Sequence, residues 1–251
     1  MGNFWDLLLE LVKADFKLRY KNSVLGLVWV LLKPLLLFLI LYGVFSFVFR
    51  FSDPNYKLNL LLGLIIFYFF SEATTRGLSA LIERSDIILK VNFPRHIAIA
   101  APVINAYINF LFNLAVFFIF WAFTPTPITW WWLTFPLYII ILGLFVVGFS
   151  LFTSIWYIKV RDLATVWEVL LSLLFYITPI VYPMSIIPIK YHQLWTLNPL
   201  TAIVRDARYI LVDGSMPGFY SIIYVGGLGL LLVVIGWWYF RTHVKRVAED
   251  F

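Results

Sequence analysis

The sequence predicts an all-α membrane protein with six transmembrane helices and both termini in the cytoplasm. Composition is the first reason: 63% of the 251 residues are hydrophobic and 13% are charged, whereas a soluble domain has about 45–50% apolar and about 25% charged residues. The second is the presence of long unbroken apolar runs, which favour helices over a barrel of short alternating strands. The third is the uneven distribution of Lys and Arg between the loops.

The chain begins with an amphipathic segment. From Phe4 to Tyr20, apolar residues such as Leu7, Leu8 and Leu11 alternate with charged residues at helical spacing. An apolar face opposite a charged face is typical of a helix that lies in the membrane interface. The basic residues follow the apolar ones and no small-residue cleavage site comes after them, unlike in a signal peptide. We therefore expect residues 1–22 to form an interfacial helix.

Six apolar segments follow, each near the length of about 20 residues that a hydrocarbon core of ~30 Å requires. They are residues 24–49, 58–81, 97–123, 132–158, 163–182 and 219–240. Lys33-Pro34 interrupts the first, and a Thr-Pro-Thr-Pro turn separates the third from the fourth. The whole chain, residues 1–251, is expected to form one transmembrane domain, with spans one to five within 24–182 and a cytoplasmic tail at 241–251.

A polar segment separates the last two spans. Residues 183–216 include Lys190 and Asp206, and are too polar to cross a membrane, yet they also hold apolar residues and a helix-like run at 201–211. Irregular backbone at membrane depth is tolerated only where protein or a water-filled cavity covers it. We expect an external re-entrant helical hairpin here.

The Lys and Arg residues give the orientation. Twelve lie in the N-terminal segment, the second-to-third loop, the fourth-to-fifth loop and the tail, whereas five lie in the other loops, and Lys33 and Arg76 fall within spans. Loops rich in Lys and Arg face the cytoplasm. This rule places both termini inside, and it explains the net charge of +6 without a nucleic-acid partner.

The sequence contains no pattern that indicates catalysis or a cofactor. There is no Cys, and His96, His192 and His243 are too far apart to begin a metal-ligand pattern. No Gly is followed by Lys, so a GxxxxGK[ST] phosphate loop is absent, and no Gly-x-Ser-x-Gly elbow occurs. We predict a protein that is not an enzyme and that holds no metal or cofactor itself.

Charged residues inside spans leave alternatives open. Glu72 and Arg76 are four residues apart, so they can pair on one helix face. They either neutralise each other at a helix contact or serve a substrate. Lys33, next to Pro34, either reaches the cytoplasmic interface or binds an anionic headgroup.

Aromatic residues recur on two spans. Four on the first span, at spacings of four, three and four, share one helix face: Phe38, Tyr42, Phe45 and Phe49. The fifth span carries a less regular set: Trp167, Phe175, Tyr176 and Tyr182. Such residues fit helix packing or lipid contact, or alternatively a pore whose rings stack on sugar faces.

Several short motifs occur in a fixed order along the whole chain. They lie at residues 15–29, 33–34, 89–95, 160–163, 178–182 and 198–200. In these motifs and in its topology the sequence resembles the permease subunit of bacterial ABC-2-type exporters that move lipid-linked polysaccharides such as O-antigen, teichoic acid and capsule chains. The first two spans are joined only by residues 50–57, which fits the polysaccharide branch better than the drug and haem exporters.

The resemblance implies partners and a location. Two copies of the chain would pair with two ATP-binding subunits, which bind ATP and Mg, and a polyprenyl-pyrophosphate-linked polysaccharide would pass between the copies. The location would be the bacterial cytoplasmic membrane. O-antigen is the favoured cargo, with teichoic acid or capsule as alternatives. A non-ABC transporter, or a transferase acting on lipid-linked sugars, is the alternative from other protein classes.

The resemblance also implies roles for single residues. The cytoplasmic loop that docks into the ATPase would use Ser85, Asp86, Lys90, Asn92, Phe93, Pro94 and Arg95; Ser85 and Asp86 stand where an Asn was expected. The cations that attract the lipid pyrophosphate would be Arg19, Lys21, Lys33, Arg84 and Arg95. Spans one and five would line the channel, which favours the pore interpretation of both aromatic sets.

Overall fold

A computed structural model of the chain describes residues 4–20, 26, 28–49, 54–90 and 93–244. In this part every regular element is helical: α1 (Phe4–Tyr20), α2 (Val28–Phe49), α3 (Tyr56–Glu83), α4 (Ser85–Lys90), α5 (His96–Ala122), η1 (Trp130–Thr134), α6 (Phe135–Lys159), α7 (Leu163–Ile177), η2 (Met184–Ile186), η3 (Ile189–Tyr191), α8 (His192–Thr196), α9 (Pro199–Leu211) and α10 (Phe219–His243). The predicted all-α class is confirmed, and so is the helical conformation of Phe4–Tyr20.

Five helical segments of the described part are long and apolar enough to cross a membrane: α2, α3, α5, η1 with α6, and α10. The segment predicted as span five, residues 163–182, is shorter than expected because α7 ends at Ile177. The next residue, Thr178, is extended (φ −77°, ψ 126°), since the ring of Pro179 disfavours the α conformation in the residue before it. The 15 residues of α7 span only about 22 Å, so its predicted boundary is wrong and a sixth crossing stays a prediction.

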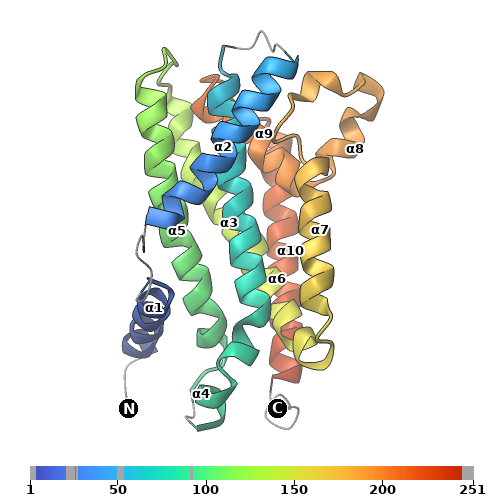
Figure 1. Cartoon of the computed structure of the whole chain (residues 1–251). Helices are drawn as coiled ribbons and strands as arrows, with labels where there is room; N and C mark the ends of the chain where they lie inside the picture. Colours follow the sequence, from blue (N-terminus) through green and yellow to red (C-terminus); the bar gives the residue numbers. More distant parts are fainter. Residues whose placement is uncertain (1–3, 21–25, 27, 50–53, 91–92, 245–251) are drawn as a thin grey trace.

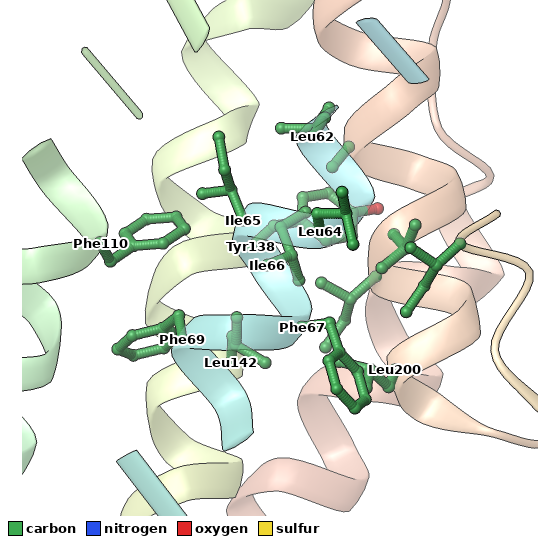
Figure 2. Packing of buried hydrophobic residues seen from close by; sticks show 14 of the residues in the cluster. Leu62, Leu64, Ile65, Ile66, Phe67, Phe69, Phe110, Tyr138, Leu142 and Leu200 are labelled. Atoms are coloured by element: carbon green, nitrogen blue, oxygen red, sulfur yellow. The ribbon is translucent and has the colours of Figure 1, made fainter. Parts of the chain in front are cut away.

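The helix α3 is the central helix of the molecule. Two thirds of its apolar window (67%) is buried, because α5, α6, α7 and α9 surround it. Figure 2 shows side chains of α3 such as Ile66 and Phe69 packed against Phe110 of α5, Leu142 of α6 and Leu200 of α9. Lipid is as apolar as these side chains, so shape complementarity rather than hydrophobicity holds the helices together.

Glycines allow two helix pairs to approach closely. A Cβ added at Gly77 of α3 would overlap the hydroxyl of Ser150 on α6. A Cβ at Gly148 of α6 would lie 2.6 Å from the carbonyl carbon of Leu232 on α10, and one at Gly236 would overlap the carbonyl oxygen of Gly148. Close backbone contact through small residues is the usual way in which membrane helices associate.

The two ends of the molecule differ in charge. Figure 1 shows α1, α4 and the C-terminal end of α10 at one end, and α8 at the other, while α2 crosses in front of α3 at a tilt. The described cations at the α1 and α4 end are Lys13, Lys17, Arg19, Arg84, Lys90, Arg95, Lys159, Arg161 and Arg241. Those toward the α8 end are Lys57, Lys190, Arg205 and Arg208.

The predicted hairpin region contains α8 and α9, and α9 is more buried than its polarity suggested. Nine of its 13 residues are buried against α3, α6 and α10. Asn198 caps α9, since its Oδ1 accepts a hydrogen bond from the Leu200 amide (3.0 Å), and its Nδ2 donates to Thr178 Oγ1 (3.0 Å). This bond joins the motifs at 178–182 and 198–200 directly.

Arg208 and Asp206, two of the three charged residues of α9, make hydrogen bonds to groups of other elements. Arg208 donates to the backbone oxygens of Asn59 (3.0 Å), Pro179 (2.8 Å) and Ile180 (2.9 Å). Irregular backbone after α7 therefore finds its partners within the protein, as an apolar surrounding requires. Asp206 is fully buried and is bound by groups of α6, α9 and α10.

Candidate functional site

A charged cavity of about 300 Å³ lies between α1, α2, α3 and α5. Its polar lining residues are Arg19, Lys33, Tyr68, Ser71, Glu72, Thr75, Arg76, Asn109 and Asn113. Arg19 comes from the end of α1, and Lys33 from the first third of α2. The cavity therefore lies toward the α1 and α4 end of the molecule (Figure 1).

Glu72 is the centre of this cavity. Its Oε1 accepts hydrogen bonds from Arg19 Nη1 and from Asn109 Nδ2 (2.9 Å), and it lies 3.2 Å from Arg76 Nε. The predicted pairing of Glu72 with Arg76 is confirmed, because residues four apart on a helix share a face. The contacts of Glu72 with Arg19 of α1 and Asn109 of α5 were not predicted, because these residues are distant from Glu72 in the sequence.

Three asparagines of α5 connect it to three other helices. Asn105 donates to the Val12 carbonyl of α1 (3.2 Å), Asn109 to Glu72 of α3, and Asn113 to the Val30 carbonyl of α2 (3.3 Å). Their spacing of four residues places them on one face, and this pattern is the sequence signal that reveals the polar side of the cavity. Such bonds between membrane helices each contribute about 0.6–2 kcal/mol.

Lys33 is the cation of this cavity that remains available. It is exposed, lies beside the buried Pro34, and makes no ion pair with any residue that the structure describes. The carboxylate of Glu72 is already shared by Arg19 and Arg76. The cavity thus combines an unneutralised ammonium group with amide and hydroxyl groups, which suits a phosphate-containing ligand.

A second cavity, of about 480 Å³, lies between α2 and α7 over the surface of α3. Its lining consists of Leu37, Phe67, Tyr68, Ser71, Thr75, Glu168, Leu171, Ser172, Phe175 and Tyr176. It shares Tyr68, Ser71 and Thr75 with the charged cavity, so the two form one continuous depression, which we call the α2–α7 groove. Both hydroxyl groups and aromatic rings line it, a combination that suits carbohydrate.

The aromatic residues predicted on the first span mostly face inward. Phe38 is 3% exposed and packs edge-on against Phe120 of α5, with ring centroids 5.7 Å apart. Phe45 packs against the core, and Tyr42 is exposed and stacks between Phe38 (5.7 Å) and Tyr56 (6.2 Å). The fourth member of this set, the Phe49 side chain, lies outside the described residues.

The aromatic residues of α7 divide between two of its faces. Phe175 and Tyr176 line the groove. Trp167 instead donates from Nε1 to Thr74 Oγ1 (3.1 Å), lies 4.1 Å from the Phe149 ring, and lines a separate apolar cavity of about 390 Å³ between α6, α7 and α9. Tyr182 lies beyond the end of α7 and donates to the Tyr176 carbonyl (2.7 Å).

The predicted cations are not all brought together. Arg19 and Lys33 line the groove. Arg84 is buried and forms an ion pair with Asp15, next to the charged cavity, and Lys21 lies outside the described residues. Arg95 is elsewhere, between α5 and α10, where it donates to the Val244 carbonyl.

Comparison with known proteins defines the class. Residues 6–212 match the family of ABC-2 type transporters. The chain belongs to this family. It is 33% identical to the O-antigen export system permease protein RfbA of Klebsiella pneumoniae, over 99% of this chain and 96% of the relative. Its identity is 27% to RfbA of Myxococcus xanthus (97% and 95%) and 26% to the polysialic acid transport protein KpsM of Escherichia coli (94% and 93%).

Membership of the ABC-2 family settles the class of protein. The chain is the membrane subunit of a transporter and not an enzyme, and it is a multi-pass protein of the bacterial cytoplasmic membrane. A transferase acting on lipid-linked sugars and a non-ABC transporter are therefore excluded.

The loop expected to reach the ATPase of an ABC-2 transporter is exposed. Figure 1 shows α4 at the far end of the molecule, beside the end of α3. Asp86, Lys90 and Pro94 are exposed, Ser85 is half-buried, and Phe93 is 9% exposed and packs into the core cluster at this end. Asn92 lies outside the described residues. The polar side chains of α4 are thus available to a partner, while Phe93 fixes the loop to the bundle.

Proposed function

We propose that the chain is the permease subunit of an ATP-driven exporter that carries lipid-linked polysaccharide, with O-antigen as the favoured cargo, across the cytoplasmic membrane. The observation that carries this proposal is its full-length similarity to O-antigen export permeases. The groove supports it independently, because hydroxyl groups and rings line it and an available Lys33 lies at one end.

The chain crosses the membrane six times in this proposal, with α7 as the fifth crossing. Both termini are cytoplasmic, α1 lies in the inner interface, and α8 and α9 form the external hairpin. The excess of cations at the α1 and α4 end supports this orientation. The embedding of α7 is supported by its exposed apolar residues, such as Val166 (50%), Val169 (55%) and Leu173 (53%).

Two copies of the chain and two ATP-binding subunits form the exporter. ATP and Mg belong to the ATP-binding subunits, which contact α4 and the loop at 160–163. Closure of those subunits on ATP would move α4, and Phe93 would transmit this movement to the bundle, since it is anchored there.

The polysaccharide follows the α2–α7 groove. Lys33, with Arg19 beside it, would hold the pyrophosphate of the polyprenyl carrier at the inner end of the groove. Sugar rings would then pass over Phe175 and Tyr176, while Ser71, Thr75 and Ser172 offer hydrogen bonds. Rings bind sugar faces without a fixed pattern of hydrogen bonds, so a long polymer can slide.

Affinity purification of the full-length chain from its native membrane in mild detergent tests the assignment. We expect a stoichiometric ATP-binding subunit and a polyprenyl-linked glycan, both identified by mass spectrometry. A chain that purifies without any ATP-binding subunit, under conditions that preserve a known membrane complex in parallel, would contradict the proposal.

Capsule polysaccharide is the second candidate cargo. The similarity to KpsM supports it. The two cargoes are distinguished in a strain that lacks the chain, because loss of O-antigen changes the lipopolysaccharide ladder on a gel, whereas loss of capsule leaves the ladder intact.

Replacement of Tyr176 by Ala is expected to slow export by about threefold or more, because a stacking surface worth roughly 0.5–1.5 kcal/mol is lost. Tyr176 lines the groove and is 72% exposed. The rate at which surface polysaccharide reappears after induction of the variant measures the effect. Tyr220→Ala is the matched control, since Tyr220 is 86% exposed on α10 and lines no cavity described here. Equal export by both variants would place the polymer path elsewhere.

A further inference from the structure

A cavity of about 400 Å³ lies between the start of α5 and the end of α10. Its lining consists of Pro94, Arg95, His96, Trp237, Phe240, Arg241 and Val244. It shares no lining residue with the α2–α7 groove, so the proposed export path does not use it. We call it the α5–α10 cavity.

The α5–α10 cavity is basic. Arg95 and Arg241 line it, and no carboxylate among the described residues does. Arg241 is exposed and makes no ion pair with the residues that the structure describes. Arg95 donates from Nη1 to the Val244 carbonyl, which fixes its guanidinium at the cavity and leaves its remaining N–H donors unbonded to described residues. Two guanidinium groups can donate several charge-assisted hydrogen bonds to one phosphate.

Aromatic rings place this cavity at the depth of the lipid headgroups. The His96 ring lies between Phe4 of α1 (5.8 Å) and Trp237 of α10 (5.7 Å). Trp237 is 43% exposed, and its neighbour Trp238 is 65% exposed. Exposed Trp residues near the end of an apolar helix are typical of the membrane–water interface.

An exposed apolar stripe runs along α10 away from the cavity. Leu230 (58% exposed), Val234 (65%) and Trp237 (43%) lead to Arg241 at spacings of four, three and four, so all four share one helix face. Only 17% of the apolar window of α10 is buried. The stripe offers acyl chains a surface that is continuous with the basic cavity.

We propose that the α5–α10 cavity binds the phosphate headgroup of an anionic glycerophospholipid such as phosphatidylglycerol, with the acyl chains along Val234 and Leu230. Basic pockets between transmembrane helices on the cytoplasmic side are a recurrent form of such sites. The assignment to the inner leaflet rests on the topology proposed above, whereas binding of the headgroup does not. Because Arg95 ends the loop after α4, this lipid would join that loop to α10.

Native mass spectrometry of the full-length chain tests the proposal, with dioleoyl phosphatidylglycerol, dioleoyl phosphatidylcholine and inorganic phosphate as separate probes. We expect phosphatidylglycerol to bind more tightly than phosphatidylcholine, and Arg241→Gln to weaken it about fivefold at low salt. Arg241→Lys should retain most of the affinity. Lys159→Gln is the matched control, because Lys159 is an exposed cation at the same end of the bundle outside the cavity.

Each outcome decides the proposal. A loss in Arg241→Gln but not in Lys159→Gln supports it. Equal affinities of these two variants for phosphatidylglycerol overturn it. Displacement of phosphatidylglycerol by inorganic phosphate at comparable concentration also overturns it, since the cavity would then be a site for free phosphate rather than for a lipid. If Arg241→Gln unfolds at the same temperature as the wild type, its weaker binding of phosphatidylglycerol is not caused by misfolding.

Discussion

Asp206→Ala is expected to destabilise the protein by about 3 kcal/mol, because it removes a buried acceptor on which the donors of Tyr138, Ser221 and Arg205 converge. Asp206 is 0% exposed. Its Oδ2 accepts hydrogen bonds from Tyr138 of α6 (3.0 Å) and Ser221 of α10, and its Oδ1 lies 2.8 Å from Arg205 Nη2. One carboxylate thus joins α6, α9 and α10. For a chain of this length the loss corresponds to a Tm lowered by roughly 10 °C, measured in detergent by intrinsic fluorescence.

Two further variants isolate the cause. Asp206→Asn keeps an acceptor oxygen for Tyr138 and Ser221 but loses the charge and the acceptor that faces Arg205, so its Tm should fall between wild type and Asp206→Ala. Asp162→Ala removes an exposed aspartate that makes no cap hydrogen bond at the start of α7, and should unfold like wild type. If Asp206→Ala unfolded at the temperature of Asp162→Ala, the buried network would not stabilise the fold.

Gly236→Leu is expected to separate α10 from α6, at a cost of about 3 kcal/mol or more. Even a Cβ at Gly236 would overlap the carbonyl oxygen of Gly148 and lie 3.1 Å from its carbonyl carbon. Backbone cannot move aside as a side chain can, so the whole helix must shift. Size-exclusion chromatography of the detergent-solubilised variant should show a reduced monodisperse peak, together with a lower Tm.

Gly227 of the same helix supplies the control. A Cβ at Gly227 meets nothing within 4 Å, and the residue is exposed. Gly227→Leu adds the same side chain at a free position and removes a residue of low helix propensity, which favours the helix by roughly 1 kcal/mol. Its Tm should equal or exceed that of wild type. If Gly227→Leu lowered the Tm as much as Gly236→Leu, the cause would be the added Leu side chain and not the loss of the α6–α10 contact.

The parts of the fold that the sequence predicted are those that the bilayer imposes. A hydrocarbon core requires an apolar run of fixed length, so α2, α3, α5, α6 and α10 lie within a few residues of their predicted ranges. The amphipathic period of α1 was equally clear. The end of α7 was missed because the apolar run continues past Thr178, although Pro179 ends the helix there.

The parts that the sequence did not predict depend on contacts between distant residues. Arg19 meets Glu72 across 53 positions, and Arg208 reaches the Asn59 carbonyl across 149. Hydrophobic periodicity carries no information about such partners. The same holds for Arg95, to which the resemblance gave the same role as Arg19 but which lies against α10 instead.

For the candidate site, the sequence indicated which helices contribute more reliably than which side chains face the groove. Spans one and five do contribute to the groove, yet the polar residues of α3 between them supply much of its surface. Phe38 shows why: a stripe at helical spacing does not reveal which way the helix is turned, and here it faces α5.

The polar inner half of α3 affects how the protein is made. This span has a mean hydropathy of 1.5, against 2.3 for α2 and 2.4 for the segment containing α6, and a charge at the centre of a lone helix costs about 2.5–3.5 kcal/mol on insertion. Arg76 of α3 itself pairs with Glu72, whereas Arg19 precedes α3 in the chain and Asn109 follows it. We therefore expect the insertion of α3 to be assisted by Arg19, which is synthesised before it, and by Asn109, which is synthesised after it.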